Sequence, residues 1–148
     1  MDLIANLAIK LAFAISIAEG FYVAGSVPAR CHNPCDLELG DRGWGVDNGK
    51  TIFAMADPDT AMDDRTDGWA AARRECLAIL SGASFVYNVN MTFEEVAAKY
   101  TGGDNPGAWS RIVCEKLNVS PMDTLAEWVK ASSLQPAAPT LPPVQTSS

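Results

Sequence analysis

The sequence predicts a single α+β domain, mainly helical, with a small β-hairpin and a disordered proline-rich C-terminal tail. Apolar residues recur at helical spacing in separate segments, one turn sequence lies between two apolar runs, and proline gathers at the end of the chain. With 148 residues, 48% of them hydrophobic, the chain is long enough for one core and too short for two ordinary domains. We expect the domain over residues 1–131 and the tail over 132–148.

The first segment is the most apolar part of the chain. Leucine, isoleucine and alanine recur there every three or four positions, so we expect a buried helix over residues 3–19, stopped by Gly20. The segment is shorter than the roughly 20 apolar residues that a spanning helix needs, and Lys10 interrupts it. Asp2 stands where a signal peptide carries a basic residue. We therefore expect no signal peptide and no membrane insertion.

The remaining elements are predicted from turn and cap signals. Residues 20–45 are rich in turn formers and should form an irregular loop, which in a small domain is usually functional. Asp47-Asn48-Gly49 predicts the turn of a β-hairpin. Trp69, Ala72, Cys76, Leu77 and Leu80 share one face of a helix that begins near Asp67. Further helices are expected to begin at the capping box of Thr92, at Asn105 and at Ser120.

Charge and composition exclude some functions. The net charge of −7 argues against a nucleic-acid binder, which needs a basic surface to neutralise phosphates. From Ser132 the chain has four prolines and no charged residue, so it cannot bury enough apolar surface to offset the entropy of ordering. This composition predicts the disordered tail.

Glu19 is the candidate catalytic residue. It is a carboxylate at the C-terminal end of an apolar helix and is followed by Gly20, Phe21 and Tyr22. Apolar surroundings and the negative end of the helix dipole both disfavour the charged form and raise the pKa of the carboxyl group. A carboxylic acid that stays protonated near neutral pH can donate a proton to a leaving glycosidic oxygen. By spacing alone, a solvent-facing glutamate at a helix end is the alternative.

The segment from Glu19 to Leu37 resembles a pattern of phage and prophage lytic proteins. In that pattern an E-G-F helix end is followed by G-S-x-P-x-R and by N-N-P-G-[ND]-L. These proteins are similar to goose-type lysozymes and lytic transglycosylases, and the likeness spans about residues 12–127. The matching residues are Glu19, Gly20, Phe21, Gly25, Ser26, Pro28, Arg30, Asn33, Pro34, Asp36 and Leu37.

The resemblance implies a lysozyme-like fold and a single-acid mechanism at Glu19. That residue would protonate the oxygen between N-acetylmuramic acid and N-acetylglucosamine and would then act as the base for the sugar's own hydroxyl. A lysozyme would use water and a second carboxylate instead. Asp36, Asp41 and Asp47 are the candidates for that second group, and we favour the single-acid route.

Five residues are candidates for substrate binding: Asn33, Tyr100, Phe21, Asp36 and Trp44. The Asn33 amide can pair with sugar hydroxyl or acetamide groups, and the Tyr100 ring can stack on a sugar. Asn33 can alternatively form a turn before Pro34, and Tyr100 can pack a helix. Trp44, between two glycines, is the tryptophan most suited to be exposed.

The motif has two departures, His32 for the first asparagine and Cys35 for the glycine. A cysteine is poorly suited to a backbone with positive φ, which leaves a purely structural relative as an alternative. Four cysteines allow three complete disulfide pairings. If all are bridged, Cys76 and Cys114 could meet in the core while Cys31 and Cys35 close the loop; free buried thiols are the alternative. Zinc held by the C-H-x-x-C segment is a weaker alternative, and we expect no metal and no cofactor.

The sequence thus predicts a peptidoglycan-cleaving glycosidase that acts at the bacterial cell wall or in the periplasm, after residence in a phage virion or the host cytoplasm. The alternative is a catalytically inactive virion structural or glycan-binding module with the same fold. Peptidoglycan is the expected partner, and virion proteins are further candidates.

Overall fold

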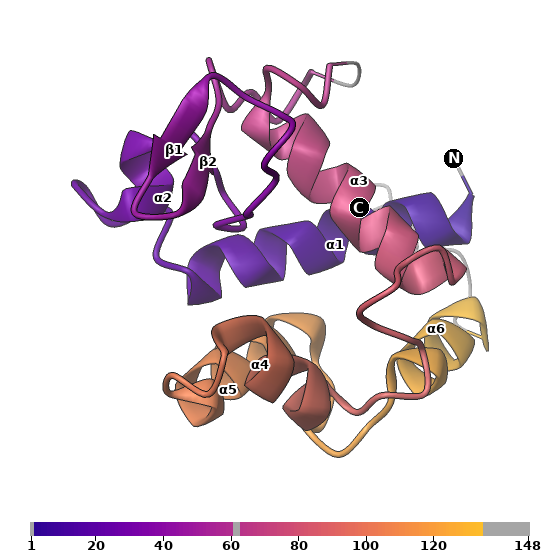
Figure 1. The fold of residues 1–148 in the computed structure, drawn as a ribbon. Helices are drawn as coiled ribbons and strands as arrows, with labels where there is room; N and C mark the ends of the chain where they lie inside the picture. The colour runs from indigo at the N-terminus through magenta and orange to yellow at the C-terminus, as the bar shows by residue number, and fades with distance from the viewer. Residues whose placement is uncertain (1, 61–62, 135–148) are drawn as a thin grey trace, which may run out of the picture.

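The computed structural model describes residues 2–60 and 63–134. Across these ranges it has six helices and one antiparallel hairpin, which confirms the mainly helical α+β class. The elements are α1 (Leu3–Ala18), α2 (Val27–Arg30), β1 (Gly45–Asp47), β2 (Lys50–Ile52), α3 (Gly68–Ser81), α4 (Phe93–Thr101), α5 (Pro106–Leu117) and α6 (Leu125–Leu134). Figure 1 shows α1 through the middle, with α2, the hairpin and α3 on one side and α4, α5 and α6 on the other.

The end of α1 confirms the predicted stop at Gly20. The helix ends at Ala18, and Glu19 is its C-cap residue. Gly20 has a φ of +78°, and the Phe21 amide donates to the Ser16 carbonyl at 3.1 Å. This bond closes a Schellman motif. Glu19 is therefore held in a fixed position at the end of a buried helix.

The segment after α1 is more regular than expected. Residues 27–30 form the short helix α2, which the sequence did not predict. Ser26 caps it by accepting a hydrogen bond from the Ala29 amide at 3.2 Å, and its hydroxyl donates to the Gly20 carbonyl at 2.8 Å. Arg30 donates to the Gly25 carbonyl at 2.6 Å. The G-S-x-P-x-R residues thus serve to fold the turn that follows Glu19.

The predicted hairpin is confirmed. Strands β1 and β2 pair antiparallel, with Asp47 opposite Lys50. The two turn residues, Asn48 and Gly49, have φ values of +55° and +82°. Positive φ at both positions is the requirement of a type I′ turn, which suits the twist of the strands.

Three of the four later helices begin as predicted. Asp67 caps α3 with hydrogen bonds from the Trp69 and Ala70 amides, and Pro106 opens α5. Thr92 and Glu95 form both bonds of the capping box of α4. One predicted core residue of α3 is wrong, because Leu77 is 42% exposed.

The last helix begins later and ends later than expected. Asp123 and Ser120 close a turn in front of α6, so the helix does not begin at Ser120. Thr124 and Glu127 instead exchange hydrogen bonds of 2.8 and 3.0 Å, which is the capping-box pattern. The helix continues to Leu134, beyond the predicted boundary at 131. The rest of the predicted tail, 135–148, lies outside the described residues.

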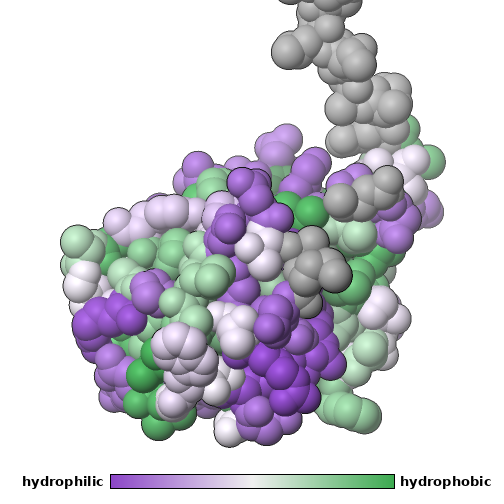
Figure 2. All heavy atoms as spheres, turned by 90° about the horizontal axis from the view of Figure 1, so that it is seen from above, coloured by the Kyte–Doolittle hydropathy of each residue, from purple (hydrophilic) through white to green (hydrophobic). Residues whose placement is uncertain are grey.

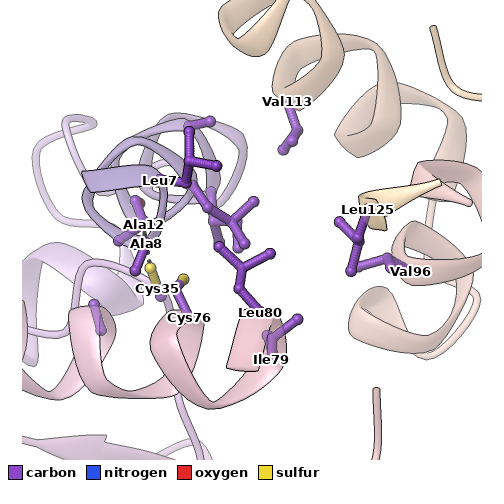
Figure 3. Packing of buried hydrophobic residues seen from close by; sticks show 14 of the residues in the cluster. Leu7, Ala8, Ala12, Cys35, Cys76, Ile79, Leu80, Val96, Val113 and Leu125 are labelled. Atoms are coloured by element: carbon purple, nitrogen blue, oxygen red, sulfur yellow. Dashed lines mark hydrogen bonds between the residues drawn. The ribbon is translucent and has the colours of Figure 1, made fainter. Parts of the chain in front are cut away.

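The core surrounds α1, which packs on both α3 and α5. Figure 3 shows Leu7, Ala8 and Ala12 of α1 near Cys76 and Leu80 of α3. On the face seen in Figure 2, hydrophilic and hydrophobic side chains are interspersed. None of the described helices has both the length and the apolar character that crossing a membrane requires.

Candidate active site

Glu19 lies on the wall of a cavity of about 370 Å³. The cavity is formed by the end of α1, the loop after α2, strand β2 and helices α4 and α5. The charged and aromatic residues that line it are Glu19, Asp36, Lys50, Tyr100, Asp104 and Trp109. The fold therefore brings together three of the sequence-predicted residues, Glu19, Asp36 and Tyr100.

The Glu19 carboxyl group is held in place by Trp109. The indole Nε1 donates to Oε2 of Glu19 at 2.7 Å. The pKa of Glu19 is raised to about 7, mainly because burial disfavours the charged form. The Trp109 bond and the charge of Lys50 oppose this rise, and Asp36 adds to it. A carboxyl group with this pKa is present in both protonation states near neutral pH, so it can give and accept a proton.

Asp36 is the predicted second carboxylate that lies beside Glu19. Its side chain is 16% exposed, and its Oδ2 lies 3.5 Å from Nζ of Lys50. Lys50 also pairs with Glu38 at 2.9 Å. The other two candidates lie elsewhere: Asp47 pairs with Arg30 at 3.0 Å, and the exposed Asp41 does not line the cavity.

Three aromatic rings follow one another, of which Trp109 and Tyr100 line this cavity and Tyr87 lines the neighbouring one. The ring centroids of Tyr100 and Trp109 lie 5.0 Å apart, and those of Tyr87 and Tyr100 lie 6.2 Å apart. The Tyr100 hydroxyl donates to the Cys35 carbonyl, so it fastens α4 to the loop beside Asp36. Burial raises the pKa of Tyr100 well above its usual value. Tyr100 therefore offers part of its ring, and not a free hydroxyl, to a ligand.

A second cavity of about 310 Å³ adjoins the first. Asp36, Lys50 and Tyr100 line both, and the second also includes Tyr87 and Glu75. The shared residues make the two cavities neighbouring parts of one groove. A chain-like ligand in this groove would pass Asp36 and lie close to Glu19.

Asn33 is not a substrate-binding residue in this structure, contrary to the prediction. Its side chain is completely buried, and its Nδ2 donates to the carbonyls of Leu37 and Thr51 at 2.9 and 2.8 Å. Its Oδ1 accepts from the Leu37 amide at 2.9 Å. Both amide hydrogens are used and the side chain is shielded from solvent, so Asn33 holds the loop to strand β2 and is not accessible to a sugar.

Phe21 and Trp44 also lie outside the groove, contrary to the prediction. Phe21 packs edge-on against Trp69, with ring centroids 5.7 Å apart, and adds to the core. Trp44 is 73% exposed, as expected, but lines neither cavity. Sequence proximity to Glu19 placed Phe21 wrongly, because the Schellman turn directs the chain away from the carboxyl group.

The expected strain at Cys35 is absent. Cys35 is not among the residues with positive φ, whereas His32 and Asp36 have φ values of +49° and +56°. Cys35 is buried, and its Sγ donates to the Ala12 carbonyl at 3.3 Å. Cys35 thus fills the core with its side chain, and the positions with left-handed backbone are His32 and Asp36.

Of the two alternatives for the cysteines, disulfides or free buried thiols, the structure has the second. All four cysteines are buried and free. The thiols of Cys35 and Cys76 contact each other between α1 and α3, as Figure 3 shows, whereas Cys114 lies 3.9 Å from the Ser110 hydroxyl. Within the described ranges no group of three or more His, Cys, Asp or Glu residues is arranged to hold a metal ion.

The sequence analysis missed two residues of the site, Lys50 and Trp109. Trp109 is buried in α5, and its N–H reaches a carboxylate 90 residues away. A buried indole N–H needs an acceptor, which was the signal available in the sequence. For Lys50, the sequence offers no sign of a role in the site, because its position in the hairpin is all that it shows.

Comparison of the chain with protein-family models, with curated proteins and with solved structures found no significant match.

Proposed function

We propose that the chain cleaves the glycan of peptidoglycan between N-acetylmuramic acid and N-acetylglucosamine, with Glu19 as general acid and then as general base. The observation that carries the proposal is the position of the Glu19 carboxyl group. It lies in a groove beside a second carboxylate, held by an indole N–H at 2.7 Å. The resemblance of Glu19-Gly20-Phe21 and the following loop to lytic proteins supplies the substrate.

The arrangement favours a lytic transglycosylase over a lysozyme. In glycosidases that use water in an inverting step, the two carboxyl groups stand about 6.5–9.5 Å apart to leave room for that water. Asp36 lines the same cavity as Glu19 and its charge raises the pKa of Glu19, so we assign Asp36 the role of a neighbouring charge and not that of a base across the sugar ring. Glu19 therefore protonates the leaving oxygen and afterwards accepts the proton of the sugar's own primary hydroxyl, so that an anhydro end forms.

The groove suits a carbohydrate chain. Sugar rings present C–H faces that pack on aromatic rings, and the partly exposed rings of Tyr87 and Tyr100 lie 6.2 Å apart between their centroids. Lys50 and Asp104 offer charged hydrogen-bonding groups to hydroxyl and acetamide groups. The protein would act at the bacterial wall or in the periplasm, as a phage lytic or virion-associated enzyme.

A digestion assay with a matched pair of variants tests the proposal. Wild-type protein should release soluble fragments from purified peptidoglycan, and Glu19→Gln should lower the release rate by a factor of about 10² to 10⁴, the usual contribution of an acid–base group. Glu115→Gln, an exposed position on α5, should leave the rate unchanged. Sedimentation with insoluble peptidoglycan should show that Glu19→Gln still binds.

The same assay distinguishes the cleaving enzyme from the alternative, a glycan-binding module without activity. A wild-type protein that binds peptidoglycan and releases no fragments would be a glycan-binding module, as a virion component can be. Release at the wild-type rate by Glu19→Gln would remove Glu19 from the mechanism.

A further inference from the structure

The starting point is one oxygen atom of Asp36. Its Oδ1 is buried and has no hydrogen-bond partner among the described residues, although its Oδ2 faces the ammonium group of Lys50. A buried carboxylate oxygen without a donor is costly, because it has lost its hydration and gained nothing in return. The described side chains show only this one such oxygen or nitrogen atom. It therefore marks a place where a proton donor is required.

Glu19 lines the same cavity as Asp36, and the charge of Asp36 raises the pKa of Glu19. Trp109 donates to Oε2 of Glu19 at 2.7 Å, so Oε2 is an acceptor and Oε1 is the oxygen left to carry a proton. A protonated carboxyl group is a donor, and a hydrogen bond from a carboxylic acid to a carboxylate is among the strong ones. One proton on Glu19 would thus give the Asp36 oxygen a hydrogen-bond donor and would leave the buried Glu19 carboxyl group uncharged.

We propose that Glu19 and Asp36 form a carboxylic acid–carboxylate pair that holds one proton, carried on Oε1 of Glu19 and donated to Oδ1 of Asp36. The catalytic part of this inference rests on the proposed function. Asp36 is then a positioning residue, because it acts on the substrate only through Glu19. The ammonium group of Lys50 faces the other oxygen of Asp36, Oδ2, at 3.5 Å.

The Glu19–Asp36 pair explains both the donation of the proton and its return to Glu19. In the first half, the proton passes from Glu19 to the glycosidic oxygen, the bond between the anomeric carbon and that oxygen breaks, and its electron pair stays on the leaving oxygen. Glu19 is now a second carboxylate beside Asp36, and like charges in contact disfavour this state. In the second half, the primary hydroxyl attacks the anomeric carbon and gives its proton to Glu19. No other reactant is needed, and the pair returns to its first state.

Other charged groups around Glu19 could produce the same effect, so they are part of the test. Asp36 and Lys50 face it from the loop and β2, Tyr100 from α4, and Asp104 from the turn before α5. The thiol of Cys35 and the hydroxyl of Tyr87 are close enough to sense its charge. Asp104 lines the same cavity with the same charge as Asp36 but is exposed, which makes it the matched control.

The experiment is a carboxyl titration of full-length protein labelled with ¹³C at glutamate Cδ, with Glu19 assigned by the signal that Glu19→Gln removes. The wild-type Glu19 signal should titrate near pH 7. Asp36→Asn should lower that midpoint by about one pH unit or more, because it removes the neighbouring charge. Asp104→Asn should change it by less than about 0.3 pH unit. Asparagine tolerates the left-handed backbone at this position, so the variant should fold.

Two results would overturn the inference: a Glu19 midpoint that Asp36→Asn leaves unchanged, or one that Asp104→Asn lowers equally. If Asp36→Asn fails to fold, infrared difference spectra of the wild-type protein decide instead. The protonated C=O band that Glu19→Gln removes should persist at pH 6, and its absence there would contradict the pair.

The activity measurement separates this inference from the proposed function. Asp36→Asn should shift the pH of fastest fragment release downward by about one pH unit. If the wild-type protein shows the expected titration but cleaves no glycan, the Glu19–Asp36 pair is supported and the proposed function is refuted. Cleavage with an unaltered pH profile in Asp36→Asn would retain the function and lose the pair.

Discussion

Glu19 lies between two walls of its cavity that are built in different ways. The loop wall consists of Asp36 and Lys50, and the helix wall consists of Tyr100 and Trp109. The loop wall is held by the buried Asn33 amide and by left-handed backbone, whereas the helix wall is held by regular helices with their own caps. The loop wall brings the charges and the helix wall brings the rings. The charges of the site thus depend on the less regular part of the chain.

The largest expected effect follows from disturbing the loop wall through its contact with α3. A Cβ atom on Gly68 would lie 1.8 Å from the His32 carbonyl oxygen and 2.9 Å from Cδ of Pro34. Gly68→Ala should therefore lower the free energy of unfolding by about 3 kcal/mol or more, measured by urea denaturation. Gly107→Ala on α5, where the Cβ atom meets open space, should be neutral or slightly stabilising. Equal stability of the two variants would show that the loop around His32 and Pro34 can move to make room for the added Cβ atom at little cost.

The next effect concerns the loss of folding stability that comes from burying the Glu19 carboxyl group between the two walls. Its pKa is raised from 4.5 to about 7 in the folded protein, so the folded state binds the proton more tightly than the unfolded state does. Its contribution to stability is complete below pH 4.5 and is lost as the pH rises through 7. Glu19→Gln should thus be more stable than wild type by about 2 kcal/mol at pH 8, with a smaller difference at pH 4. A constant difference across that range would contradict the raised pKa.

A smaller effect is expected from the helix wall. Trp109→Phe keeps most of the ring and removes the N–H that stabilises the charged form of Glu19. The pKa of Glu19 should rise by about one pH unit, which the same carboxyl titration measures. Trp128→Phe, in the core against Phe93, should leave the midpoint unchanged. A fall of the midpoint in Trp109→Phe would mean that burial by the indole outweighs its hydrogen bond.

The smallest effect is expected at Lys50. Its charge lowers the pKa of Glu19 and is the least of the causes that act on it. Lys50→Met should raise the midpoint of Glu19 by less than about half a pH unit. A shift larger than that of Trp109→Phe would make Lys50, and not the indole, the main stabiliser of the charged form.

Local signals account for most of what the sequence predicted correctly. The Gly20 stop, the Asn48-Gly49 turn and the capping box at Thr92 each need only a few neighbouring residues, and each is confirmed. The start of α6 was wrong because Ser120 satisfies its own backbone in a turn with Asp123. Helix α2 was missed because four residues give no periodic pattern.

The site was predicted in part, for the same reason. Glu19, Asp36 and Tyr100 were chosen by residue type and resemblance, and the fold brings them to one cavity. Asn33 was chosen by the same signal, yet its amide is used by the Thr51 carbonyl 18 residues away. Trp109 reaches Glu19 across 90 residues. Contacts at such separations depend on packing that no local pattern records.

Mass spectrometry of the fragments released from purified peptidoglycan tests the central claim most directly. The account predicts muropeptides with anhydro ends from the wild-type protein and none from Glu19→Gln, with the Glu115→Gln control giving the wild-type products. Anhydro fragments released by Glu19→Gln at the wild-type rate would contradict it.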